Sequence, residues 1–242
     1  MALRCYRLPL NIITERCRTM RNYTKEEAIS IVASCAKKYR DELVGRSLLF
    51  VCMDKHKHIS CIEFTFDASN YLHLTGLKLK DTVDSSGQKV KLSATDFYNK
   101  CLDHRLSTNE FDFAEDGTTM LKLDVLPYVM NKSLSAVMIG DYNSANPKLY
   151  TEKLVGSVKA CVGFVSSNQR YVPNTVLQVD IRHYTSNTVR VIAVFRKLRG
   201  SETYEELTYK AKKVEWEQVC YPGEYMYLQK IRGCGGKNNN ED

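Results

Sequence analysis

The chain has 242 residues, of which 43% are hydrophobic and 26% charged, so it has the composition of an ordinary globular protein with enough apolar residues for a core. This composition excludes a wholly disordered chain and a fibrous one, and no apolar run reaches the roughly 18 to 20 residues that a membrane-spanning helix needs. The formal net charge is +7, and residues 1–46 hold ten Lys or Arg against five Asp or Glu. Such an excess favours a polyanionic partner such as nucleic acid.

Residues 1–23 contain five arginines, one glutamate and no uninterrupted apolar stretch, so we interpret them as a basic arm rather than a secretory signal. The nine cysteines are odd in number and include no C-x-x-C pair. We therefore expect free, mostly buried thiols in a reducing cytoplasm, rather than disulfides or a structural zinc site. We also expect no metal, no cofactor and no membrane association.

Helices are predicted over residues 24–44, 93–106 and 118–130. Thr24 and Glu27 form the pattern of a capping box at the start of the first, and Gly45 fits its end. The third contains Pro127, where we expect it to bend or end.

Strands are predicted over residues 47–53, 62–67, 133–142, 155–165, 177–183 and 189–195. The first two form the pattern of a hairpin, and the last is apolar on both faces, so it should lie inside a sheet. In residues 155–165, Val158 should share a face with Phe164, and in residues 177–183, His183 should lie on the apolar face. Residues 80–92 are expected to form an exposed loop, and residues 233–242 a disordered tail. The pattern as a whole indicates an α+β fold with an antiparallel-leaning sheet.

One histidine, His73, stands in a segment whose residue types suit phosphodiester chemistry. It lies in Asn70–Lys80 (NYLHLTGLKLK), just after a predicted strand. Imidazole can move a proton near neutral pH, and the two lysines can stabilise an anionic transition state. The glycine lets the backbone approach a phosphate closely. The remaining histidines fit surface, helix-capping or core positions.

Three short motifs then follow one another in a recognisable order: His73–Leu77 (HLTGL), Asp96–Tyr98 (DFY) and Tyr171–Leu177 (YVPNTVL). Together they resemble the fourth phage-type subgroup of the barnase–EndoU–colicin–RelE-like nucleases, over roughly residues 47–210. The resemblance implies N-terminal helices packed on a curved, mainly antiparallel sheet. It also implies metal-independent cleavage of RNA by a toxin or effector of phage or prophage type. Such a protein would act in the cytoplasm of the bacterial host or phage-infected cell, where a protein antitoxin or inhibitor could bind it.

On this interpretation the chain divides into four parts: a basic arm (1–23), an N-terminal helix (24–46), a nuclease-type domain (47–232) and a tail (233–242). The arm and the helix would be additions to a nuclease-like core.

The resemblance also suggests roles for individual residues. In metal-free RNA cleavage a base takes the proton from the ribose 2′-OH, an acid protonates the leaving 5′-oxygen, and a cation holds the added negative charge. His73 is the candidate base or acid, Thr75 could orient it or bind phosphate, Lys153 could be the cation, and Thr175 could bind the phosphate. Candidate substrate-binding residues are Lys78, Lys80, Tyr98, Arg170, Tyr171 and Lys197. The sequence does not place the second catalytic group that must work with His73; His183 is a candidate only if the face of its strand opens to the site.

Two other functions stay open. His73-Leu74-Thr75 and His183-Tyr184-Thr185 are two H-x-T triplets, which resemble the two-histidine phosphodiesterases that act on cyclic nucleotides. In that family an apolar residue usually follows the threonine, whereas Gly76 and Ser186 follow here. The chain could also be a catalytically inactive module that binds nucleic acid through its basic arm and its fifteen tyrosines.

Overall fold

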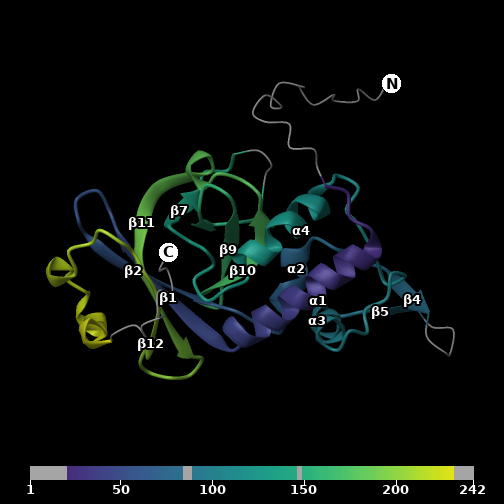
Figure 1. The fold of residues 1–242 in the computed structure, drawn as a ribbon, viewed down its shortest axis with the longest axis horizontal. Coiled ribbons are helices and arrows are strands. Elements are labelled where there is room, and N and C mark those ends of the chain that lie inside the picture. Colours follow the sequence, from purple (N-terminus) through teal and green to yellow (C-terminus); the bar gives the residue numbers. More distant parts are fainter. Residues whose placement is uncertain (1–20, 84–88, 146–148, 232–242) are drawn as a thin grey trace, which may run out of the picture.

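The computed structural model describes residues 21–83, 89–145 and 149–231 (Figure 1). The α-helices are α1 (Lys25–Glu42), α2 (Tyr71–Thr75), α3 (Ala94–Leu102) and α4 (Thr118–Val129). The strands are β1 (Arg46–Met53), β2 (Ile59–Thr65), β3 (Lys78–Leu79), β4 (Asp81–Val83), β5 (Lys89–Lys91), β6 (Phe111–Asp112), β7 (Met138–Tyr142), β8 (Lys153–Gly156), β9 (Cys161–Ser167), β10 (Arg170–Leu177), β11 (Thr185–Leu198) and β12 (Glu206–Lys210). Short 3-10 helices are η1 (Ala68–Asn70), η2 (Ile181–His183), η3 (Trp216–Gln218) and η4 (Gly223–Lys230).

Seven strands of the described chain close into a barrel. Their order is β1-β2-β10-β9-β8-β7-β11, and β11 pairs back with β1, while β12 is added to β11 outside the ring. The pairings in the ring are antiparallel except for that of β2 with β10, where Tyr171 lies opposite Phe64. The predicted mixed α+β fold with a mainly antiparallel sheet is therefore confirmed, and the curvature goes as far as closure of the barrel.

The inner face of the barrel and the helices share one hydrophobic core. All seven ring strands contribute to this cluster, through residues such as Phe50, Phe64 and Val155, and so do α1–α4. The outer face carries two smaller clusters. One, around Leu49 and Phe195, is covered by the segment after β12, and the other is covered by η2. Figure 1 shows the helices on one side of the strands and the C-terminal segment, in yellow, on the other.

Helix α1 forms as its sequence predicts. The hydroxyl of Thr24 accepts a hydrogen bond from the backbone N–H of Glu27 (3.2 Å), and the Glu27 carboxylate accepts one from the N–H of Thr24 (2.9 Å). The helix ends at Glu42, and Gly45 follows with a φ of +72°. Its buried side chains, including Val32 and Tyr39, belong to the main core, so α1 is packed as part of the same body as the barrel.

Strands β1 and β2 form the expected hairpin. The strand predicted over residues 189–195 is part of β11 and lies inside the sheet as expected, because β11 pairs with β1, β7 and β12. The other two predicted helices also exist. Helix α3 ends at Leu102, and α4 continues past Pro127 to Val129. The helix thus ends two residues after Pro127, as expected for a residue that has no N–H for the hydrogen bond to the carbonyl four residues earlier.

Two predicted strands were too long because turns interrupt them. Strand β7 begins only at Met138, since the side-chain oxygen of Asn131 accepts hydrogen bonds from the N–H groups of Ser133 and Ser135 and holds a turn there. Residues 155–165 are a hairpin, not one strand. The N–H of Ser157 donates to Ala160 (2.9 Å), and Val158 is exposed at the turn, not on the face of Phe164.

Two further expectations were wrong. Strand β10 ends at Leu177, and Asp180 caps the turn η2 by accepting a hydrogen bond from the N–H of Arg182 (3.0 Å). His183 is consequently exposed and not on an apolar strand face. Residues 80–92 contain the paired strands β4 and β5 rather than a plain loop. The basic arm, except for residues 21–23, and the tail at 233–242 lie outside the described residues.

Candidate active site

His73 lines a cavity of about 440 Å³ that is bounded by the helices α2 and α4, the short strands β3 and β5, and Asn174 of β10. The polar residues around it are His73, Lys78, Lys91, Lys122 and Asn174. No carboxylate is among the described residues that line it. A histidine surrounded by cations and an amide is an arrangement that suits an anionic ligand.

The short helix α2 places the His73 side chain at this cavity because its opposite side is anchored in the core. Tyr71 and Leu74 are fully buried, and the Tyr71 hydroxyl donates to the carbonyl oxygen of Val32 in α1 (2.6 Å). His73, between them, is exposed. The helix stops at Gly76, whose φ of +72° is the left-handed conformation that glycine adopts without strain.

The sequence did not single out Lys91, Asn174 or Lys122 as site residues, and of these it is Lys122 that forms a hydrogen bond with His73. Lys122 lies on α4, and its Nζ donates a hydrogen bond to the carbonyl oxygen of His73 (2.8 Å). Its aliphatic chain passes over Gly76, where a Cβ would come within 2.7 Å of its Cδ. Burial, and after it the positive charge of Lys78, lower the pKa of Lys122 to about 8, while Asp116 acts in the opposite direction. Its one signal in the sequence is that it is the only cation within the apolar stretch 118–129.

The two other lysines of the cavity come from neighbouring strands. Lys78 begins β3, directly after the turn at Gly76, and Lys91 ends β5; both are exposed. No carboxylate of the described residues forms an ion pair with either of them or with Lys122. Their charge is therefore available to a bound anion.

Thr75 and Tyr98 are buried away from the cavity. The Thr75 hydroxyl donates to the carbonyl of Leu72 (2.8 Å) and accepts from the N–H of Leu77 (3.2 Å), so both contacts support the end of α2. Tyr98 is 3% exposed and packs against Tyr39 and Tyr71, and burial raises its pKa to about 12. In this conformation its ring cannot stack on a nucleobase.

Lys153 and Tyr171 form a separate polar group in the barrel. The Lys153 Nζ lies 2.6 Å from Asp141 and 5.6 Å from the centre of the Tyr171 ring. The hydrogen bonds that Lys153 and Asn187 donate to Asp141 lower the pKa of that carboxyl. None of these residues lines the cavity at His73.

The remaining predicted residues are dispersed. Thr175 is buried and lies opposite Gly163, on the strand face away from the inner residues Val162 and Phe164. Lys197 lies on the outer face, where its Nζ is 4.5 Å from the centre of the Tyr204 ring and 3.7 Å from Glu63.

The Nζ of Lys80 lies 2.9 Å from a carboxylate oxygen of Asp112, so Lys80 forms an ion pair with that residue. Arg170 is exposed at the start of β10. Of the predicted residues, the structure thus brings His73 and Lys78 together around one cavity.

The two H-x-T triplets do not meet. His183 lies on η2, which packs through Ile181 against Leu154 and Cys161 on the outer face of the barrel. His73 belongs to α2, whose buried residues pack against the inner face. The two imidazoles therefore lie on opposite faces of the barrel strands.

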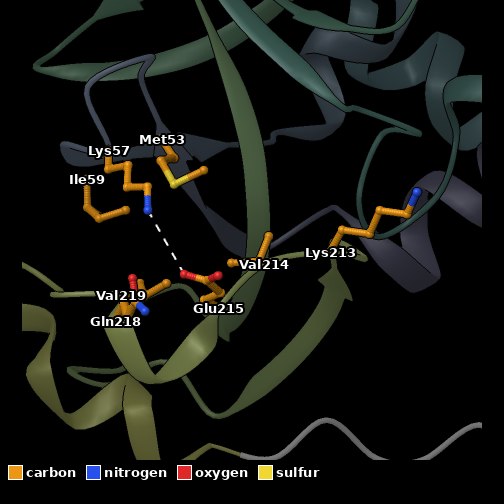
Figure 2. Close-up of a pocket in the computed structure, with 8 residues that line it drawn as sticks. All are labelled: Met53, Lys57, Ile59, Lys213, Val214, Glu215, Gln218 and Val219. Atoms are coloured by element: carbon orange, nitrogen blue, oxygen red, sulfur yellow. Dashed lines mark ion pairs between the residues drawn. The ribbon is translucent and has the colours of Figure 1, made fainter.

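A second cavity, of about 230 Å³, lies between the turn of the β1–β2 hairpin and residues 213–219 (Figure 2). Lys57 reaches toward Glu215 (4.0 Å), while Lys213 points away from the cavity. Both partners of this ion pair are exposed, so it contributes little to stability. The cavity holds none of the candidate catalytic residues.

No three His, Cys, Asp or Glu side chains of the described chain gather as a metal ion would require. Within the same residues, no helix is both long and apolar enough to cross a bilayer.

Comparison with models of known protein families gave a match. The model of the family described as phage-Barnase-EndoU-ColicinE5/D-RelE like nuclease4 matches residues 31–213, which is most of the chain. The match begins within α1 and ends shortly after β12. Neither the curated proteins nor the solved structures gave a match.

Proposed function

Because this chain belongs to the phage-Barnase-EndoU-ColicinE5/D-RelE like nuclease4 family, we propose that it is a metal-independent endoribonuclease of phage or prophage type that acts as a toxin or effector. The observation that carries the proposal is the cavity that His73 shares with three lysines and Asn174, without a lining carboxylate among the described residues. Phosphodiesters are the anionic substrates that such a site fits, and cation contacts with phosphates dominate affinity for nucleic acids.

RNA fits this site better than DNA for a chemical reason. The ribose 2′-OH is an internal nucleophile, so a site that offers an imidazole and cations needs no activated serine and no metal-bound water. His73 is exposed at the cavity and can take the proton of the 2′-OH. Lys78, Lys91 and Lys122 can hold the phosphate as its negative charge increases. The Asn174 amide accepts from the Thr151 hydroxyl and donates to the carbonyl of Tyr150, which leaves its second N–H for the phosphate.

The test is cleavage of mixed RNA, including tRNA, by the purified full chain in EDTA. We expect products with 2′,3′-cyclic phosphate ends, and no cleavage of DNA, which lacks the nucleophile. His73→Ala should lower the rate by about 10²- to 10⁴-fold, as expected when a general acid or base is removed.

His183→Ala is the matched control, because His183 is an exposed imidazole on the opposite face of the barrel. It should cleave RNA at the unmodified rate. If His183→Ala abolishes activity toward cyclic nucleotides, the two-histidine alternative replaces the nuclease. If the folded wild type binds RNA and cleaves none, the chain is a binding or inhibitory module.

A further inference from the structure

Cleavage at the site proposed above needs two proton transfers, and His73 supplies one group. We propose that Lys122 is the general acid of this reaction, with His73 as the general base; the proposal rests on the proposed function. It assigns the catalytic partner of His73 to a helix 49 residues further along the chain.

The position of Lys122 supports this role. Lys122 lines the same cavity as His73, and its Nζ donates a hydrogen bond to the carbonyl oxygen of that residue at 2.8 Å. An ammonium group has three protons, so one hydrogen bond to the carbonyl fixes the nitrogen and leaves two N–H groups for a bound phosphodiester. Gly76 keeps the path open for the side chain, because any Cβ there would lie 2.7 Å from the Lys122 Cδ.

The surroundings of Lys122 make its ammonium group a better proton donor than an ordinary lysine. The charges of Lys78 on β3 and Asp116 before α4 act on it, and the titratable residues His73 on α2 and Lys91 on β5 line the same cavity. The side chain is half-buried, and burial together with Lys78 lowers its pKa to about 8. Near neutral pH it is still mostly protonated, and it gives up the proton more readily than a solvated lysine.

Lys78 and Lys91 are less suited to this step because both are exposed, so water solvates their ammonium groups. They can stabilise charge, and Lys122 can in addition donate the proton.

The step balances without an added reactant. His73 takes the proton from the 2′-OH, and the 2′-oxygen forms a bond to phosphorus. The bond from phosphorus to the 5′-oxygen breaks, and the Lys122 ammonium gives its proton to that oxygen. The products are a 2′,3′-cyclic phosphate and a 5′-hydroxyl; the enzyme returns to its first state when a proton moves from His73 to Lys122 through solvent.

The experiment compares two RNA oligonucleotides that differ in one atom, with oxygen or sulfur as the 5′ bridging atom at a single cleavage site. A thiolate leaves without being protonated, so the sulfur substrate does not need a general acid. On the oxygen substrate, Lys122→Met should cleave about 10²- to 10⁴-fold more slowly than the wild type. On the sulfur substrate, Lys122→Met should come within about 10-fold of the wild type, whereas His73→Ala should be slow on both.

Lys122→Arg provides a second variant that keeps the positive charge but cannot give up its proton at accessible pH. Its cleavage rate should fall as much as that of Lys122→Met on the oxygen substrate and should recover as much on the sulfur substrate. Lys57→Met, at the cavity of Figure 2, should match the wild type on both substrates. The wild-type kcat/KM should fall with rising pH around pH 8 on the oxygen substrate, and this fall should be absent on the sulfur substrate.

The outcomes separate the two proposals. If the wild type cleaves neither substrate, the proposed function fails. If the wild type is active and Lys122→Met and Lys122→Arg lose equal activity on both substrates, Lys122 only positions His73 and the assignment as general acid is overturned. Unchanged activity of Lys122→Met on the oxygen substrate overturns it as well.

Discussion

Gly76 leaves room for the Lys122 side chain, whose Nζ donates a hydrogen bond to the carbonyl of His73. An alanine at this position has two separate effects. Its φ of +72° costs a residue with a Cβ about 1–2 kcal/mol, and its Cβ would lie 2.7 Å from the Lys122 Cδ, so this flexible side chain must move aside. We therefore predict that Gly76→Ala lowers the free energy of unfolding by about 1–2 kcal/mol. We also predict that it slows RNA cleavage by about 10²-fold, because displacement of a catalytic group by about 1 Å has that effect. Urea unfolding and the cleavage assay measure the two effects separately.

Gly45→Ala is the matched control for this prediction. Gly45 has the same φ of +72°, but a Cβ there would meet no atom within 4 Å. The stability loss should therefore be similar, and cleavage should stay at the wild-type rate. Equal activity of the two variants would mean that the path of Lys122 over Gly76 does not matter for the reaction.

The residues of the site could be predicted from the sequence only where they are close together along the chain. His73, Gly76 and Lys78 lie within six residues, and the structure keeps them at one cavity. Lys122 and Asn174 reach it through the packing of α4 and β10, which no local pattern encodes. Lys197 was predicted to bind phosphate because it is a lysine. It lies on the outer face of β11, like Phe195, and its Nζ lies over the ring of Tyr204 instead.

At the scale of elements, the capping box of α1 is a local feature whose strength can be measured. Thr24→Ala removes the hydroxyl that accepts the N–H of Glu27. We predict a loss of about 1 kcal/mol in the free energy of unfolding, the usual effect of losing an N-cap hydroxyl. Chemical denaturation measures it. Ser30→Ala, an exposed position inside the same helix, should leave stability unchanged or slightly higher, because alanine is the better helix former. A similar loss in both variants would argue against the cap.

Elements whose signals are local were predicted well, and those set by turns or by distant partners were not. The capping box and the apolar stripe define α1, and the alternation of β2 defines the hairpin. At Asn131 and Ser157, hydrogen bonds hold turns inside segments whose sequences otherwise resemble strands. Closure of the barrel depends on β1 pairing with β11 about 140 residues later, which no periodicity reveals.

At the scale of the whole molecule, the two sides of the barrel have different roles. The side with the helices carries the cavity at His73, and the other side is covered by the C-terminal segment. Residues 214–231 lie beyond the match to the family, yet they cover the outer cluster around Leu49 and Phe195. We therefore infer that this segment stabilises the barrel and does not take part in the reaction.

A pair of substitutions in η4 tests that inference. Leu228 is 1% exposed in the outer cluster, whereas Met226, two residues earlier, is 59% exposed. Leu228→Ala removes a buried side chain and leaves a cavity, so we predict a loss of about 2–5 kcal/mol in the free energy of unfolding. Met226→Ala should change it by less than about 0.5 kcal/mol. Both variants, assayed at a temperature where both are folded, should cleave RNA at the wild-type rate. A rate that falls in folded Leu228→Ala would instead connect the C-terminal segment to the cavity at His73, and the barrel strands between them would then have to transmit the change.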